Sequence, residues 1–217
     1  MKNNLRIVIS GTVGIGKSTV TEALVKRLGE EGNKVNYIKE ETVDSIYLDY
    51  YYKSPQDWAF VAQLDFLLGR FKQWLTDERT RDSQNDYITV YDRHFIDDYV
   101  FAELHTIKQN ISQFNSLTYQ AVYKELLEKL SKKDARPDFF ILLTAPLETI
   151  IDRLKGRGRG EELDVDMDYW QDLYSNYYNR PMFRNHFKSN VKNFVEVSTE
   201  NKQPEQIVSE IMEILGK

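Results

Sequence analysis

A glycine-rich segment near the start of the chain has the composition of a phosphate-binding loop. Residues 11–19 read GTVGIGKST and contain the full pattern G-x-x-x-x-G-K-[ST]. The glycines let consecutive backbone N–H groups face an anion, while Lys17 reaches the β and γ oxygens and the Ser18 hydroxyl ligates Mg²⁺. This segment, called the P-loop below, therefore predicts a site for a nucleoside triphosphate. The predicted contributors are Gly11, Thr12, Val13, Gly14, Ile15, Gly16, Lys17, Ser18 and Thr19.

Acidic and basic residues follow the next two apolar runs of the chain. The first of these runs is followed by Glu40 and Glu41, and the second ends in Asp92 and Arg93. Phosphoryl transfer needs a carboxylate that accepts the proton of the attacking hydroxyl, and cations that meet the transferred charge. Both are available here, whereas His94 is expected to have a structural role.

Residues 155–163, KGRGRGEEL, combine glycines with arginines. Arg157 and Arg159, with Arg153 one turn earlier, are expected to meet phosphate oxygens, and the glycines supply hinge freedom. Such a run can also be an arm that binds nucleic acid, but the net charge of −5 argues against a dedicated nucleic-acid binder. We therefore expect a lid at about 153–163.

Alternating strands and helices are expected to bring these residues together. This order predicts a single α/β domain over 1–217, with a five-stranded parallel sheet covered by helices on both faces. Ligands bind outside the carboxyl ends of the strands of such a sheet, where the charged residues lie. Strands are predicted at 5–10, 34–39, 87–92, 138–145 and 193–198, and helices at 18–28, 54–75, 95–107, 116–132, 146–155, 166–179 and 203–215.

Composition narrows the class of protein. A chain of 217 residues with 41% hydrophobic residues can bury a substantial core. There is no cysteine, and the three histidines show no metal-ligand spacing. The N-terminal run is too short and polar for a signal peptide, and no run approaches the ~20 apolar residues of a membrane span. We expect a cytoplasmic protein with neither a membrane nor a nucleic acid as partner.

Four motifs, in this order, resemble those of the deoxynucleoside kinase family, which includes deoxyadenosine, deoxyguanosine and deoxycytidine kinases and is related to herpesvirus thymidine kinases. They are GTVGIGKST, KEE, YDRHF and RLKGRGRGEEL, and the resemblance covers nearly the whole chain. It implies a P-loop kinase fold with an arginine-rich lid. It also implies ATP- and Mg²⁺-dependent phosphorylation of the 5′-hydroxyl of a deoxynucleoside, in nucleotide salvage, by a homodimer whose helices pack side by side.

The resemblance implies a general base after the second strand. Alignment without gaps from Gln63 selects Glu40, whereas matching ETV to the family's E-P-V selects Glu41. We favour Glu40, which would accept the proton of the 5′-hydroxyl.

The third strand ends in a match to the family's D/E-R-S motif, with His94 in place of the serine. The resemblance places Arg93 on the 5′ oxygen and the transferred phosphoryl group. The resemblance places Asp92 close to Mg²⁺, as Ser18 is, and also makes Asp92 a catalytic residue and an alternative candidate for the proton acceptor.

The lid and the nucleoside pocket are assigned in the same way. Arg157 resembles a catalytic arginine, and with Arg153 and Arg159 it would clamp the phosphates of ATP. Glu162 matches the glutamate that joins Tyr52 on the 3′-hydroxyl.

The base is expected to contact the helix after Pro55. Gln63 and Arg70 are seven residues apart and so lie on one helix face. The resemblance places Gln63 on the base and gives Arg70 an acidic partner at Asp97, or at Asp98 if the register shifts by one. Thymidine-type relatives have uncharged residues at this pair. The acceptor is therefore expected to be deoxyadenosine, deoxyguanosine or deoxycytidine, the two purine deoxynucleosides being favoured.

Two other functions remain open on the sequence. A thymidylate-type nucleoside monophosphate kinase would need extra arginines for the acceptor's phosphate, and the chain offers Arg70 and Arg93 but no E-P-G-G-T-like segment. A non-catalytic nucleotide-binding module would explain the P-loop but not the other motifs. A GTPase is disfavoured because residues 201–204, NKQP, lack the acid of N-K-x-D.

Overall fold

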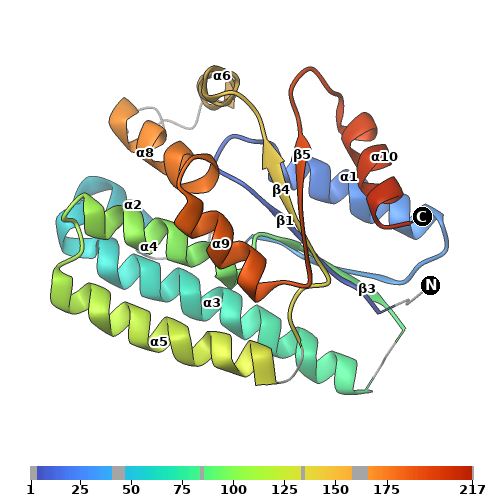
Figure 1. Cartoon of the computed structure of the whole chain (residues 1–217), viewed down its shortest axis with the longest axis horizontal. Helices are drawn as coiled ribbons and strands as arrows, with labels where there is room; N and C mark the ends of the chain where they lie inside the picture. Colours follow the sequence, from blue (N-terminus) through green and yellow to red (C-terminus); the bar gives the residue numbers. More distant parts are fainter. Residues whose placement is uncertain (1–3, 41–46, 84–85, 133–134, 158–165, 217) are drawn as a thin grey trace.

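The molecule is built on a parallel sheet of five strands in the order β2-β3-β1-β4-β5. A computed structural model describes residues 4–40, 47–83, 86–132, 135–157 and 166–216 (Figure 1). The predicted sheet is confirmed, and every strand lies within one residue of its predicted bounds. The strands are β1 (Arg6–Ser10), β2 (Val35–Ile38), β3 (Ile88–Asp92), β4 (Phe139–Thr144) and β5 (Asn193–Ser198).

Burial explains why these runs form strands. β1, β3 and β4 occupy the middle of the sheet and are almost wholly buried, as expected for continuous apolar runs covered on both faces. Ile7 of β1 pairs with Val90 of β3 on one side and with Phe139 of β4 on the other. The edge strands β2 and β5 are less buried.

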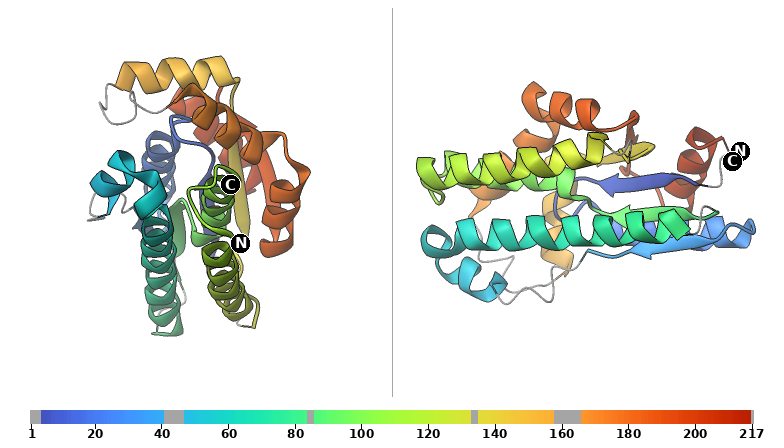
Figure 2. Two further views of the ribbon diagram at one scale, coloured as in Figure 1. Left: turned by 90° about the vertical axis from the view of Figure 1, so that its left-hand side faces the viewer. Right: turned by 90° about the horizontal axis from the view of Figure 1, so that it is seen from below.

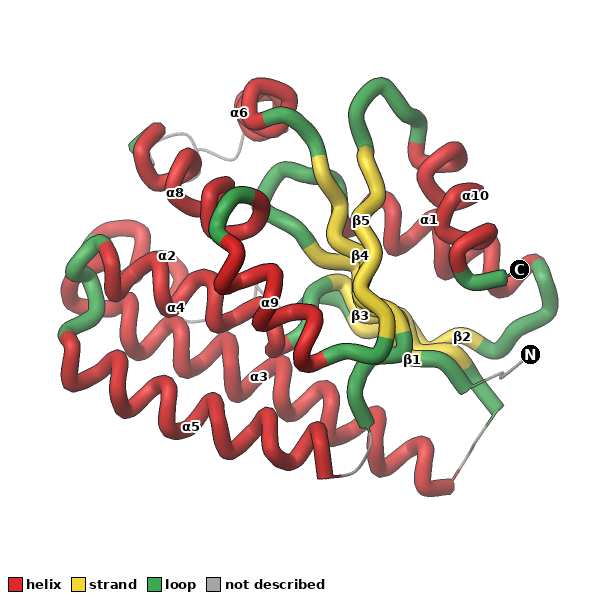
Figure 3. Tube along the Cα trace, viewed as in Figure 1, coloured by secondary structure: helices red, strands yellow, loops and turns green. Residues whose placement is uncertain are grey.

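Helices cover both faces of the sheet, as predicted. α1 and α10 pack together on one side, and α3, α4, α5 and α9 lie on the other (Figures 1 and 3). The long helices α3 and α5 contact each other (Figure 2). The helices are α1 (Lys17–Glu30), α2 (Leu48–Lys53), α3 (Pro55–Ser83), α4 (Asp98–Ile107), α5 (Gln113–Lys132), α6 (Leu147–Arg157), α8 (Met167–Tyr178), α9 (Pro181–Asn190) and α10 (Pro204–Ile214).

Three differences from the expected helices stand out. α2 and α9 were not predicted, α3 extends to Ser83, and a 3₁₀ turn, η1 (Phe95–Asp97), precedes α4. None of the helices in the described ranges is long and apolar enough to cross a membrane.

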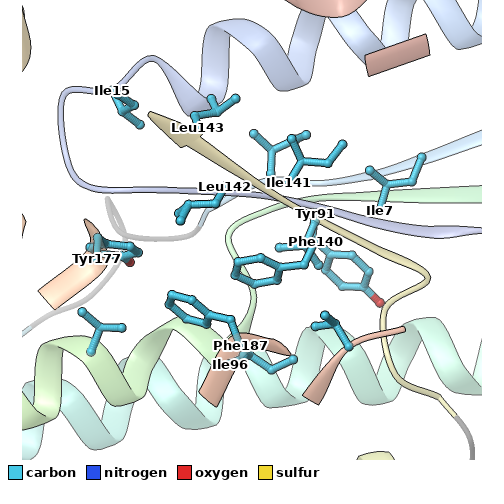
Figure 4. Close-up of a cluster of buried hydrophobic side chains, with 14 of the residues drawn as sticks. Ile7, Ile15, Tyr91, Ile96, Phe140, Ile141, Leu142, Leu143, Tyr177 and Phe187 are labelled. Carbon is cyan, nitrogen blue, oxygen red and sulfur yellow. The ribbon is translucent and has the colours of Figure 1, made fainter. Parts of the chain in front are cut away.

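The core between the sheet and the helices is rich in aromatic side chains. Phe140 of β4 stacks on Phe187 of α9, with ring centroids 4.8 Å apart, and Tyr177 of α8 lies against the same Phe187 (Figure 4). Tyr91 and Ile96 are also fully buried in this cluster. The packing fixes α8 and α9 against the sheet, and α8 carries residues that reach the functional site.

Candidate active site

The P-loop has the strand–loop–helix setting that its motif requires. It leaves β1 at Ser10 and enters α1 at Lys17. Gly14 has φ +80°, and a Cβ there would lie 2.8 Å from Cγ of Leu154 in α6. Gly16 has φ +99°, so both positions favour glycine because other residues rarely adopt such angles.

Lys17 is a buried cation at the start of α1. Its Nζ donates to the Thr12 carbonyl at 3.1 Å, and the side chain is nearly inaccessible. Burial, reinforced by the nearby Arg93 guanidinium, lowers the pKa of Lys17 to about 8. A bound anion would offset this effect, which fits the predicted contact with phosphate oxygens.

A chain of ion pairs joins Glu40, after β2, to α3 and to the end of β3. Glu40 Oε1 lies 2.6 Å from Arg93 Nε and 2.9 Å from Arg70 Nη2. Burial alone would raise the pKa of Glu40, but Arg93, Lys17 and Arg70 outweigh it and lower the pKa to about 2. Glu40 is therefore an ionised carboxylate at neutral pH, held among cations.

Arg70 continues this chain to an acidic residue on α4. Its Nη1 donates to Asp98 Oδ1; the Asp98 side chain is buried, and that of Arg70 is only 10% exposed. The first of the two expected partners, Asp97, is therefore wrong, and the alternative, Asp98, is the residue that pairs with Arg70. Asp97 ends η1 and turns back to accept from the His94 N–H at 3.2 Å, whereas Asp98 begins α4 and points toward α3.

Asp92 lies at the end of β3, beside the P-loop. Its Oδ1 is buried and accepts no hydrogen bond within the described part of the chain. Burial raises the pKa of Asp92, while Lys17 and a hydrogen bond from the Ser18 side chain act in the opposite direction. A carboxylate oxygen free to coordinate and a neighbouring hydroxyl fit the donor set that Mg²⁺ prefers beside nucleotide phosphates.

His94 has the structural role expected of it. Its Nδ1 accepts from the Ile96 N–H at 3.2 Å, and its ring lies 4.4 Å from that of Phe95. Burial lowers the pKa of His94 to about 3, so the imidazole is neutral.

A cavity of about 750 Å³ connects the P-loop to the ion pairs. Its size is in the range of small-molecule sites, ~300–1,000 Å³. The predicted site residues that line it are Val13, Gly14, Ile15, Gly16, Lys17, Ser18, Thr19, Glu40, Tyr52, Gln63, Arg70, Asp92, Arg93 and Arg153. Gly11, Thr12 and Asp97 do not line it.

The lining includes aromatic residues that the sequence reasoning did not assign. Tyr51 of α2, Phe66 of α3, Phe101 of α4 and Tyr169 and Trp170 of α8 all face this cavity. The aromatic density of α2 and α8 was visible in the sequence, but it is equally typical of a core, and only the fold tells the two apart.

Arg153 holds the P-loop in place. Its Nη1 donates to the Ile15 carbonyl at 3.0 Å and to Thr199 Oγ1 at 2.9 Å, and its Nη2 donates to the Thr199 carbonyl at 3.1 Å. The guanidinium thus connects α6, the P-loop and the segment after β5, where it borders the cavity.

Several predicted residues lie outside the described part of the chain. Arg157 ends α6, but its side chain is not among the described atoms. Glu41, Arg159 and Glu162 fall in the ranges 41–46 and 158–165, which the structure does not describe. Their assigned roles stay predictions.

Comparison with known proteins agrees with the fold. Residues 7–216 match the deoxynucleoside kinase family model. The chain is 33% identical over 179 residues to a deoxyadenosine/deoxycytidine kinase of Bacillus subtilis (strain 168), covering 82% of this chain and 76% of the relative. It is 30% identical over 171 residues to a deoxyguanosine kinase of the same strain, covering 79% and 75%.

Solved structures show the same relationship. The chain is similar to a deoxyadenosine kinase from M. mycoides with bound dCTP, with a TM-score of 0.78 and 28% identity over 98% of this chain and 99% of the other. The same kinase with bound dATP also gives a TM-score of 0.78, at 27% identity. The P-loop, the ion pairs of the cavity and these similarities lead to one conclusion: the chain belongs to the deoxynucleoside kinase family and is a phosphotransferase that acts on a deoxynucleoside.

Proposed function

We propose that this enzyme transfers the γ-phosphoryl group of ATP to the 5′-hydroxyl of deoxyadenosine or deoxyguanosine, with deoxycytidine as a further acceptor. The observation that carries the proposal is the run of ion pairs Asp98–Arg70–Glu40–Arg93 along the cavity. At one end of this run, Asp98 and Arg70 provide charged groups that can bind a nucleobase. At the other end, Glu40 and Arg93 provide charged groups for the reacting hydroxyl. The names of the relatives, which include kinases for deoxyadenosine, deoxycytidine and deoxyguanosine, support the same range of acceptors.

The base end favours a ring with an exocyclic amino group. Gln63 is a buried amide on the cavity wall, and both Asp98 Oδ2 and Arg70 Nε are buried without a hydrogen-bond partner in the described residues. An acceptor beside a donor suits adenine, with its N6 amino group and N7, and also cytosine, with its N4 amino group and N3. Guanine presents its N7 and O6 acceptors to the donor instead, whereas thymine has neither an exocyclic amino group nor an N7 atom.

At the reacting end Glu40 accepts the proton of the 5′-hydroxyl, and Arg93 holds the 5′ oxygen and the transferred phosphoryl group. Tyr52 and Glu162 hold the 3′-hydroxyl. Lys17 and the backbone N–H groups of the P-loop bind the donor phosphates.

Further cations bind the phosphates of ATP, the phosphoryl donor. Arg157 and Arg159 meet the transferred oxygens, with Arg153 behind the P-loop. Ser18 and Asp92 would hold a magnesium ion, which when bound neutralises charge on the phosphates.

We further propose a cytoplasmic homodimer that forms through α3 and α5. These helices contact each other and expose large apolar side chains, including Leu68, which is 51% exposed, and Phe114 and Leu117, which are 83% and 58% exposed. Sedimentation equilibrium of the wild type and of Phe114→Glu tests this arrangement. A dimer that the substitution dissociates is expected, and a wild-type monomer would contradict it.

The function is tested by incubating the enzyme with ATP, Mg²⁺ and each of the four deoxynucleosides, and separately with the four deoxynucleoside monophosphates. Deoxyadenosine and deoxyguanosine are expected to give the 5′-monophosphates at the highest kcat/KM, with thymidine lowest. Lys17→Met is the control, because it should abolish transfer to every acceptor. Phosphorylation of the monophosphates alone would instead support the thymidylate-type alternative, and no turnover at all would support a binding module.

A further inference from the structure

Two consecutive tyrosines near the end of α8 form hydrogen bonds with residues of the site. The Tyr177 hydroxyl accepts a hydrogen bond from Arg93 Nη1 at 2.6 Å and donates one to Asp97 Oδ1 at 3.1 Å. Tyr177 is fully buried, and so is Asp97. A helix that does not itself carry the reacting groups therefore fixes the arginine at the end of β3.

Asp97 holds the Tyr177 hydroxyl in position by accepting its hydrogen bond. Its carboxylate also accepts from Ser10 Oγ and from the His94 N–H at 3.2 Å. A carboxylate bound by three donors from β1, the β3 end and α8 has a fixed position, so the tyrosine hydroxyl that donates to it is fixed as well. This gives Asp97 a place in the site different from the contact with Arg70 that the sequence suggested.

Arg93 needs such support because its backbone is strained. Its φ of 70° lies in the left-handed region, which non-glycine residues rarely adopt and which persists only where surrounding contacts enforce it. The guanidinium has a separate contact for each nitrogen: Nε with Glu40 at 2.6 Å, Nη1 with Tyr177, and Nη2 with the Gly11 carbonyl at 3.3 Å. Tyr177 is the only one of these three partners with a hydroxyl group.

Tyr178 makes the corresponding contact with the P-loop. Its hydroxyl accepts from the Thr12 N–H at 3.2 Å and donates to the Leu143 carbonyl at the end of β4 at 2.8 Å. One helix therefore bonds both the loop expected to hold the donor phosphates and the arginine expected to meet the acceptor.

We propose that Tyr177, supported by Asp97, is a positioning residue that orients the Arg93 guanidinium toward the transferred phosphoryl group, and that Tyr178 ties the P-loop to the same helix. α8 thereby sets the distance between the donor side and the acceptor side of the reaction. The proposal rests on the role of Arg93 in the proposed function. If Tyr177 only packed in the hydrophobic core, its aromatic ring would be needed but its hydrogen bond with Arg93 would not.

Tyr177→Phe separates these two possibilities, because it keeps the ring that packs on Phe187 and removes only the hydroxyl. The expected result is a kcat for the best deoxynucleoside that is lower by about tenfold or more, since small misplacement of a reacting group has large effects on rate. The KM values for deoxynucleoside and ATP should stay within about twofold, because Arg93 acts mainly in the transition state. Asp97→Asn should change kcat in the same direction.

Tyr123→Phe is the matched control. Tyr123 is another buried tyrosine, but its hydroxyl donates to the Ile96 carbonyl at 3.1 Å and contacts His186 rather than Arg93 or the P-loop. Its loss should lower the melting temperature about as much as Tyr177→Phe does and leave kcat unchanged. Equal effects of both variants on kcat would overturn the proposal.

A double-mutant cycle gives the sharpest test. If Tyr177 acts through Arg93, Tyr177→Phe should have little further effect on kcat in an Arg93→Lys background. Effects that multiply independently would show that Tyr177 does not act through Arg93 and would also overturn the proposal. A wild type that phosphorylates no deoxynucleoside would instead defeat the proposed function, since the comparison would then have no reference rate.

Discussion

Arg70 binds two carboxylates at once. One nitrogen of its guanidinium donates to Asp98, beside the expected base, and another donates to Glu40, the expected proton acceptor, at 2.9 Å. Since both contacts share one rigid planar group, a change at the base end is transmitted directly to Glu40. In the proposed function, one side chain would therefore couple recognition of the nucleobase to activation of the 5′-hydroxyl.

Sequence reasoning singled out Gln63, Arg70 and Glu40, and the structure places all three on one cavity. The sequence left both Asp97 and Asp98 open as the partner of Arg70. These neighbours lie at the junction of η1 and α4, where consecutive side chains point in different directions. A shift of one residue in the alignment therefore exchanges Asp98, which pairs with Arg70, for Asp97, which binds Tyr177 and through it supports Arg93. Only the coordinates of the junction resolve this choice.

The pair Arg70–Asp98 predicts a specificity change. Arg70→Met combined with Asp98→Ala should raise the ratio of kcat/KM for thymidine to that for deoxyadenosine by at least about tenfold, because the unpaired polar groups that disfavour thymine are removed. The absolute rate should fall, since Glu40 loses one of its cations. The control is the double variant Arg70→Met with Asp97→Ala. Its ratio of kcat/KM for thymidine to that for deoxyadenosine should not exceed the ratio of Arg70→Met alone. An equal shift with Asp97→Ala would contradict the assignment of Asp98.

At the scale of elements, the strands and most helices followed from periodicity, but α2 and α9 did not. α2 has only six residues, rich in tyrosine, and shows too little of a helical period to be recognised. α9 begins at Pro181, directly after the end of α8, where proline was equally consistent with a loop. These two short helices are stabilised by packing, which a sequence pattern does not reveal.

The fit of the P-loop against α6 predicts the effect of one methyl group. Gly14→Ala should destabilise the protein by about 1–3 kcal/mol and weaken ATP binding, because the new Cβ meets Leu154 and the left-handed backbone disfavours alanine. Gly69→Ala, in the interior of α3 with nothing within 4 Å of the added Cβ, should stabilise by about 0.5–1 kcal/mol. Calorimetric titration with ATP and thermal unfolding measure both effects. Normal ATP affinity in Gly14→Ala would show that the P-loop does not depend on this contact.

Across the whole molecule, His94 and His105 are buried, His186 is half-buried, and all three imidazoles are neutral. Burial lowers the pKa of His94 to about 3 and those of His105 and His186 to about 4. Each binds a proton in the unfolded chain below pH ~6.5 but resists it in the folded one. The free energy of unfolding therefore falls as the pH drops from ~6.5 toward 4, and the histidine contribution is fully present above that window.

His105→Gln isolates one part of this pH dependence. At pH 5 a histidine with this shift costs about 2 kcal/mol relative to pH 7, from ~1.36 kcal/mol per pKa unit. The loss of unfolding free energy between pH 7 and pH 5 should thus be smaller in the variant by about that amount. Urea titrations of the wild type and the variant at the two pH values give these free energies of unfolding. The contribution of the carboxylates is common to both proteins and cancels in the difference between them. Parallel pH profiles would mean that His105 titrates normally in the folded protein.

The proposed mechanism depends above all on Glu40, as the group that accepts the proton of the deoxynucleoside 5′-hydroxyl. Single-turnover phosphoryl transfer by Glu40→Gln measures this most directly, with Glu41→Gln as the matched variant. The rate for Glu40→Gln should be lower by about 100-fold or more, as expected for the loss of a general base, with the Kd for ATP nearly unchanged. Glu41→Gln should stay near the wild-type rate. A nearly normal rate in Glu40→Gln, with the loss appearing in Glu41→Gln, would contradict the account.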